Sequence, residues 1–316
     1  MCAFVTQHIE HWPGRQAVLL VHGIGDASAA AAPFPLLELH SALGALSNDL
    51  AVYTLNYDFI SDWTQRKLQL EVAVRALAGA VSSRFGNADA GARLAEYGGD
   101  VLWPVLHEDT RRAIRDALIV QLQQVFLDAG AAALARNEDP LDYRVSIIAH
   151  SMGCFHTYEL LHAMAREPSY RLRPGTDGTQ LASVVLMASP VTLIRTVAGD
   201  LAPLVPSPGD LATLDPAGLS LPSERVGRRK VAATRRFVAV TGTQDPVGGH
   251  LFGQRHDWGY MDVPGQQTTI VSQSLLGADP VAALVAGLGT GNPVSDPHSW
   301  SAYVTGQSAL LREALA

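Results

Sequence analysis

Five short runs of mostly β-branched apolar residues are spaced along the chain, and each run ends in a cluster of turn-forming residues. Runs of about four to eight apolar residues are typical of strands that are covered on both faces, as in a parallel sheet. Helical patterns separate the runs, and this alternation predicts an α/β fold with a mostly parallel central sheet and helices on both faces. The runs span residues 17–21, 51–55, 144–149, 183–187 and 237–240.

We expect a single domain over residues 1–316 that carries two longer insertions. Residues 57–143 form a mainly helical insertion between the second and third predicted strands. Residues 191–235 contain five prolines, which exclude one regular helix. We interpret this second segment as a loop-rich cap or lid, with a surface insertion of no function as the alternative. Apolar residues recur at helical spacing in 36–46, 68–80, 114–135, 155–164 and 301–315.

The composition excludes several classes of protein. Hydrophobic residues make up 47% of the chain and charged residues 17%, whereas disordered chains combine low hydrophobicity with high net charge. The net charge of −7 argues against nucleic-acid binding, which normally uses a basic surface. The two cysteines, Cys2 and Cys154, are too few for a disulfide framework or a four-thiolate zinc site.

The start of the chain bears on its location in the cell. The first residues lack the basic and apolar segments of a secretion signal. The longest apolar run near the start, residues 17–21, is far too short to span a bilayer. We therefore expect a cytoplasmic protein without stable insertion into a membrane.

The most informative motif surrounds Ser151, directly after the third apolar run and before a helical pattern. A nucleophilic serine on a tight turn between strand and helix is held in a strained backbone conformation. Positions two residues before and after it must be small because the chain folds back on itself, and Ala149 and Gly153 meet this requirement. The helix N-terminus favours developing negative charge. We predict that Ser151 is a nucleophile; the alternative is an ordinary N-cap serine.

A serine hydroxyl is a weak nucleophile at neutral pH and needs a positioned base. His298 fits this role because it lies late in the chain, in a loop that precedes a helical pattern, with Pro297 before it. His250 and His256 are the alternatives.

The base in turn needs a carboxylate that holds its tautomer and stabilises the imidazolium. Asp245 follows the fifth apolar run, at the carboxyl end of a predicted strand, where α/β sheets place functional groups. The alternatives are Asp257 and Asp296, or a purely structural role for Asp245 as a turn residue before proline.

An oxyanion needs two preorganised N–H donors. The residue after the nucleophile, Met152, supplies one of them. The loop after the first predicted strand should supply the other, because Gly23 and Gly25 allow sharp turns that aim the amide of Ile24. An ordinary turn that ends the strand is the alternative for this loop.

The sequences VHGIG at 21–25 and AHSMG at 149–153, with the chain order Ser151, Asp245, His298, resemble the α/β-hydrolase superfamily. The two motifs are similar to those of small bacterial lipases and esterases whose serine motif begins with alanine. The resemblance implies an α/β-hydrolase fold, a catalytic triad of these three residues, and oxyanion donors at Ile24 and Met152. It covers four patches, around 18–26, 145–158, 237–247 and 296–300.

The sequence contains no clear motif for a metal ion, a nucleotide phosphate or a dinucleotide cofactor. His250, His256 and Asp257 lie close together and could hold a metal, but their spacing matches no tight structural zinc pattern. No Walker-type phosphate loop is present, and the loop at 23–28 lacks the third glycine of a dinucleotide-binding motif. We expect no cofactor.

These observations predict a serine hydrolase that cleaves a small-molecule ester or a lipid through an acyl-enzyme on Ser151. A second hypothesis keeps the same three residues but passes the acyl group to another acceptor, as an acyltransferase or thioesterase does. A third hypothesis is a binding protein of the same fold that carries out no chemistry.

Overall fold

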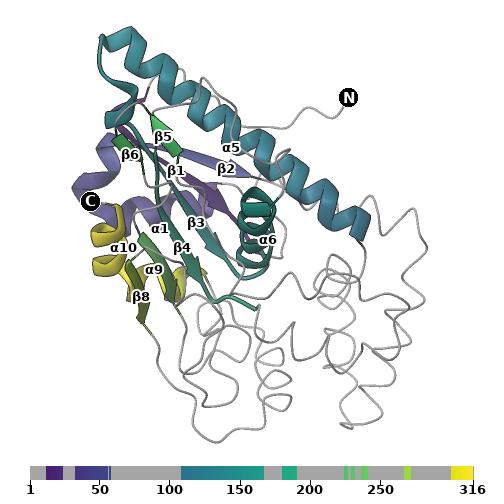
Figure 1. The fold of residues 1–316 in the computed structure, drawn as a ribbon. Helices are drawn as coiled ribbons and strands as arrows, with labels where there is room; N and C mark the ends of the chain where they lie inside the picture. The colour runs from purple at the N-terminus through teal and green to yellow at the C-terminus, as the bar shows by residue number, and fades with distance from the viewer. Residues whose placement is uncertain are drawn as a thin grey trace, which may run out of the picture.

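Six strands pair in parallel to form one sheet within the part of the chain that the computed structural model describes (Figure 1). Their order across the sheet is β2-β1-β3-β4-β7-β8. The described residues are 12–23, 33–55, 57, 108–166, 180–190, 224–226, 229–231, 236–240, 267–271 and 300–315. The strands of this sheet are β1 (Gln16–Val21), β2 (Leu50–Leu55), β3 (Arg144–His150), β4 (Gln180–Met187), β7 (Arg236–Val240) and β8 (Gln267–Val271).

All five predicted strands are confirmed, and three further strands were not predicted. Among the described strands, β8 lies at one end of the order and pairs only with β7, so its sequence lacks the continuous apolar run of a central strand. Two short strands, β5 (Glu224–Val226) and β6 (Arg229–Val231), pair antiparallel within the segment that we interpreted as a cap or lid. The rest of that segment up to residue 235 lies outside the described residues.

The helices agree with the sequence patterns except at their ends. The predicted helix at 36–46 stops early because Gly44 takes a positive φ of 59°, and a 3₁₀ helix follows. The predicted helix at 301–315 is two helices that meet at Gln307. The pattern at 68–80 lies outside the described residues. The helices are α1 (Pro33–Leu43), α5 (Glu108–Arg136), α6 (Met152–Arg166), α9 (Trp300–Gly306) and α10 (Ser308–Leu315), with 3₁₀ turns at Gly44–Asp49 and Pro140–Asp142.

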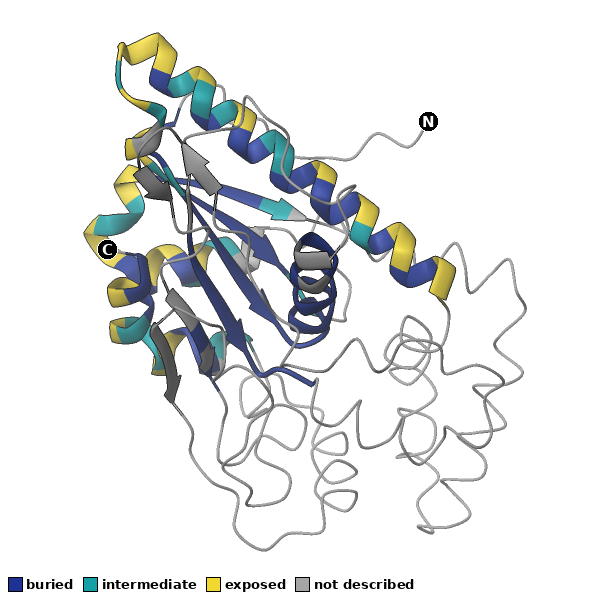
Figure 2. Cartoon of the chain, in the orientation of Figure 1, coloured by how far each residue is buried: buried dark blue, intermediate teal, exposed yellow. Residues whose placement is uncertain are grey.

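Helices cover both faces of the sheet, as the apolar runs predicted. Side chains alternate along β1, so that Leu19 packs with α5 and α6, whereas Leu20 packs with α1, α9 and α10. The same alternation places Val184 and Val185 of β4 on opposite faces. Figure 2 shows the central strands and the described part of α6 buried, and α5 divided into a buried and an exposed face. Both apolar layers therefore depend on the two-sided burial of the central strands.

α5 forms much of one apolar layer. Its buried side chains, Ile114, Leu122 and Phe126 among them, pack with those of the central strands and of α6. By length and composition alone this helix could cross a membrane, but half of its most apolar window is buried inside the structure. The second half of the predicted 57–143 insertion thus contributes a core helix, and residues 58–107 lie outside the described residues.

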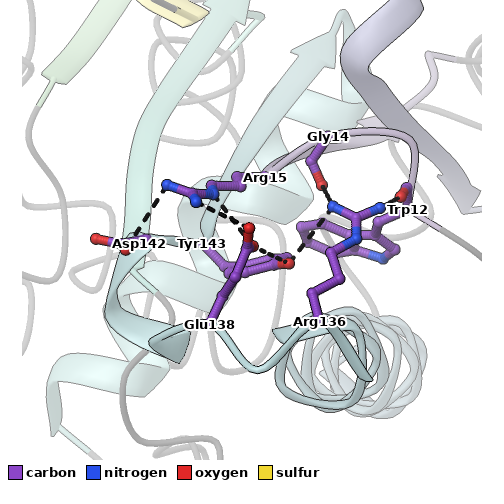
Figure 3. A network of polar contacts seen from close by, with 7 residues as sticks. All are labelled: Trp12, Gly14, Arg15, Arg136, Glu138, Asp142 and Tyr143. Carbon is purple, nitrogen blue, oxygen red and sulfur yellow. Dashed lines mark hydrogen bonds and ion pairs between the residues drawn. The ribbon is translucent and has the colours of Figure 1, made fainter. Parts of the chain in front are cut away.

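A polar network at the amino edge of the sheet joins the segment before β1 to the segment before β3 (Figure 3). Arg15 donates two hydrogen bonds to the carboxylate of Glu138, at 2.8 and 3.1 Å, and the Tyr143 hydroxyl donates a third at 2.8 Å. The hydrogen bond from Arg15 holds the pKa of Glu138 below its ordinary value. Because Arg15 is half exposed, we expect this network to fix geometry more than it adds stability.

A second set of hydrogen bonds anchors the same edge. Arg136, at the end of α5, donates to the backbone carbonyl oxygens of Gly14, at 3.0 Å, and of Trp12 (Figure 3). The indole N–H of Trp12 donates to the Tyr53 hydroxyl at 2.7 Å, which in turn donates to Asp128 on α5 at 3.0 Å. The end of α5, the entry to β1 and the middle of β2 are thereby held together.

Two neighbouring residues of α5 test its role in the core. Phe126 is 2% exposed and Leu127 is 52% exposed. We expect Phe126→Ala to lower the free energy of unfolding by about 3–5 kcal/mol through lost burial and a cavity. The matched control Leu127→Ala should change it by about 0.5 kcal/mol or less. Urea unfolding of both variants makes the measurement, and equal losses would contradict this packing of α5.

Candidate functional site

β1 and β3 are neighbours in the sheet, and after their carboxyl ends the chain continues to helices on opposite faces. β1 lies between β2 and β3. After β1 the chain continues to α1 on one face of the sheet, and after β3 it continues to α6 on the other face. α/β proteins bind ligands at such a topological switch point, outside the carboxyl ends of the strands. The described residues at this point are His22, Gly23 and Ser151.

Ser151 occupies the strained turn that the sequence predicts. Its φ is 52°, a left-handed conformation that costs a residue with a Cβ roughly 1–2 kcal/mol. Its backbone N–H donates to the carbonyl of Met187 on the neighbouring strand at 3.0 Å, and α6 begins at the next residue. A Cβ at Gly153 would overlap the carbonyl oxygens of Val21 and His22. The first turn of α6 therefore packs directly on the backbone of β1, which only glycine permits.

The adjacent strand ends in the same way. Ala188 follows β4 with a φ of 55°, and its N–H donates to the carbonyl of Val240 on β7 at 3.0 Å. At both strands, the residue in the left-handed conformation makes one more hydrogen bond to the next strand as the chain turns away. Two neighbouring strands thus end in defined and strained backbone geometry at the same edge.

Gly23 lies against the Ser151 turn. A Cβ at Gly23 would lie 2.7 Å from Ser151 Cβ, so a larger residue would force the loop away from the serine. The loop is held by Tyr57, whose hydroxyl donates to the carbonyl of His22 at 2.8 Å. The rings of Tyr57 and His22 are stacked, 4.6 Å apart and 2° from parallel. His22 Nδ1 lies 2.5 Å from the carbonyl oxygen of Gly23, and since that oxygen can only accept, Nδ1 carries the proton.

Two histidines, the half-buried His22 and the buried His156, contact the Tyr57 ring. His156 of α6 meets the Tyr57 ring edge to face at 4.7 Å, and neither of its ring nitrogens has a hydrogen-bond partner in the structure. Burial, together with the nearby His22 and Arg111, lowers the pKa of His156 to about 3. Burial also lowers the pKa of His22, and its bond to the Gly23 carbonyl only partly opposes this. Both histidines are therefore neutral at physiological pH.

The structure places two of the five predicted site residues. Ser151 lies at the switch point, and Met152 is the first residue of α6, with a buried side chain. Trp300, the first residue of α9, meets the His150 ring edge to face at 5.8 Å. The remaining predicted residues lie outside the described part of the chain: Ile24, Asp245 and His298, with the alternatives His250, His256, Asp257 and Asp296.

Sequence reasoning missed Tyr57 and His156, and assigned no role to His22 beyond its motif. The one signal for Tyr57 in the sequence was an aromatic residue two positions after the second predicted strand. The parallel pairing of β1 with β2, Val21 opposite Leu55, then brings position 57 level with Gly23. His156 gives no comparable signal, since a histidine inside a helical pattern is common.

Among the described residues, no group of three or more histidine, cysteine, aspartate or glutamate side chains could hold a metal ion. The cluster formed by His250, His256 and Asp257 lies outside the described residues.

The chain matches no family model and no curated protein sequence.

The backbone strain at Ser151 can be measured with two substitutions. Both Ser151→Gly and Ser151→Ala remove the hydroxyl, but only glycine adopts a positive φ without cost. We expect Ser151→Gly to have a free energy of unfolding about 1 kcal/mol higher than Ser151→Ala. Thermal or urea unfolding gives the difference. Equal stability of the two variants would show that the turn is not strained.

The buried His156 predicts weaker stability in acid. Its folded-state pKa of about 3 lies below the ordinary value of 6.5, so between these values the unfolded chain binds a proton that the folded chain does not. The part of the free energy of unfolding that depends on an uncharged His156 is fully present above pH 6.5 and is lost as the pH falls toward 3.

Replacement of His156 should therefore flatten the acid side of the stability profile. Between pH 7 and pH 5, wild type should lose about 2 kcal/mol more free energy of unfolding than His156→Phe, since one unit of pKa shift is about 1.4 kcal/mol. Urea unfolding across this pH range makes the measurement. His40→Gln, a change at an exposed position of α1, is the control and should follow wild type. Parallel profiles for wild type and His156→Phe would refute the assignment.

Proposed function

We propose that the chain is a serine hydrolase of the α/β-hydrolase fold that cleaves carboxylic esters of small molecules or lipids. The observation that carries the proposal is the strained turn at Ser151, which lies at the topological switch point with the backbone of Gly23 packed against it. A serine held in a left-handed conformation at the start of a helix, beside a glycine loop, is typical of an exposed nucleophile with oxyanion donors close by.

Each proposed step uses a residue of this chain. His298 removes the proton from the Ser151 hydroxyl as its oxygen attacks the ester carbonyl, and Asp245 orients and stabilises the resulting imidazolium. His298 then protonates the leaving alcohol, and an acyl-enzyme remains on Ser151. A water molecule, activated by the same base, hydrolyses this intermediate and restores the serine.

The negative charge that develops on the carbonyl oxygen is stabilised by backbone amides. Met152 opens α6, and the first N–H groups of a helix have no partner within the helix. The N–H of Met152 and the dipole of α6 therefore favour an anion beside Ser151. The second donor is the amide of Ile24, directly after Gly23.

Described residues close in sequence to Asp245 and His298 support the roles that we propose for these two residues. Asp245 follows β7 by five residues, and β7 is separated from β3 by β4 alone. His298 precedes Trp300 by two residues, and the Trp300 ring contacts His150, the neighbour of Ser151. Two residues of chain span about 7 Å at most, and this short separation in sequence from Trp300 supports the role that we propose for His298.

A series of p-nitrophenyl esters from acetate to palmitate tests the proposal. We expect wild type to hydrolyse at least one of them, and Ser151→Ala to lose on the order of a million-fold in kcat, because the nucleophile is absent. Ser146→Ala is the matched control, since Ser146 is a buried serine of β3, the strand that ends just before Ser151. It should retain wild-type kcat.

The chain-length profile then identifies the substrate class. A maximum at short acyl chains indicates an esterase, and a maximum at long chains indicates a lipase. Near-full activity in Ser151→Ala would rule out this mechanism.

A further inference from the structure

We infer that Tyr57 is a positioning residue that fixes the loop after β1 in the orientation needed to bind the oxyanion. This inference rests on the proposed function, because it assigns Tyr57 to the same site. Tyr57 touches no reacting atom in this scheme and acts through the backbone of His22 and Gly23.

The sheet brings Tyr57 to this loop. Because β1 and β2 pair in parallel with Val21 opposite Leu55, their carboxyl ends are level, and Tyr57 lies two residues beyond β2. Its hydroxyl donates to the His22 carbonyl at 2.8 Å, and its ring stacks on the His22 ring at 4.6 Å. Tyr57 is 3% exposed, so no water competes freely for this hydrogen bond.

Two successive carbonyl groups of the loop are held in this way. Tyr57 fixes the carbonyl of His22, and the Nδ1–H of His22 fixes the carbonyl of Gly23. A trans peptide is planar, with its C=O and N–H pointing in opposite directions. The direction of the Gly23 carbonyl therefore sets the direction of the next N–H, which is the amide that we propose as an oxyanion donor.

The same stack connects the loop to the helix that carries the other donor. His156 also contacts the Tyr57 ring, at 4.7 Å and an interplanar angle of 71°. His156 belongs to α6, whose first residue, Met152, supplies the second proposed N–H. Tyr57 thus contacts both of the segments that would carry the two proposed donors.

Tyr57→Phe tests the inference, because it removes the hydroxyl and keeps the ring. Loss of one oxyanion donor costs roughly 100–1,000-fold in kcat, so misdirection of a donor should cost about 10–100-fold. We expect this loss in kcat for the best p-nitrophenyl ester, with KM within about twofold of wild type, because the donor acts mainly on the transition state.

Tyr53→Phe is the matched control. It also removes a buried tyrosine hydroxyl with two hydrogen-bond partners, at the middle of β2 and away from the switch point. It should lower the thermal midpoint and leave kcat unchanged. The variant Tyr57→4-aminophenylalanine keeps the ring, restores a donor at the para position, and should recover most of the lost kcat. If Tyr57→Phe does not fold, the kcat of Tyr57→4-aminophenylalanine is compared with that of wild type instead.

The outcomes separate the inference from the proposed function. If Ser151 is required for hydrolysis but Tyr57→Phe keeps wild-type kcat, or Tyr53→Phe loses as much, the positioning role is wrong and the proposed function stands. If no ester shows Ser151-dependent turnover, the rate of fluorophosphonate labelling of Ser151 replaces kcat, since it uses the same donors. Labelling slowed only in Tyr57→Phe supports the inference, and absence of labelling in wild type overturns both proposals.

Discussion

The close contact between the first turn of α6 and the backbone of β1 determines the geometry of the whole carboxyl edge. Gly153 carries no Cβ, and α6 can therefore pack on the carbonyl groups of Val21 and His22. That contact brings the loop after β1 to Ser151, and Gly23 completes it from the other side. The strained serine and the stacked rings lie together at this edge only because two glycines allow this close approach.

Residues with a positive φ occur at both edges of the sheet, since Asn137 at the amino edge has a φ of 56°, but the hydrogen bonding of the two edges differs. The carboxyl edge carries two residues with positive φ, Ser151 and Ala188, and a buried histidine without a hydrogen-bond partner. The amino edge instead carries the satisfied polar network around Arg15 and Glu138 and the bonds of Arg136 to the backbone (Figure 3). A well-bonded edge at one end of the strands can offset conformations at the other end that cost free energy and serve a site.

Local sequence patterns predicted the features that depend on local interactions. The apolar runs predicted five strands because central parallel strands are buried on both faces, and the small residues around Ser151 predicted its turn. β8, at one end of the described strand order, escaped prediction because a strand there needs no continuous apolar run. The division between α9 and α10 follows Gly306, the last residue of α9, and this glycine was overlooked as a helix end. Tyr57 could be placed only from the pairing of β1 with β2, which no local pattern supplies.

The protonation state of the ring stack links burial to the orientation of the loop. The Nδ1–H of His22 orients the Gly23 carbonyl while the ring is neutral, and burial keeps it neutral by lowering its pKa. A proton on either His22 or His156 would put a charge beside Tyr57 in a site with little water, which costs free energy. The same burial that lowers both pKa values therefore keeps the ring stack uncharged at neutral pH.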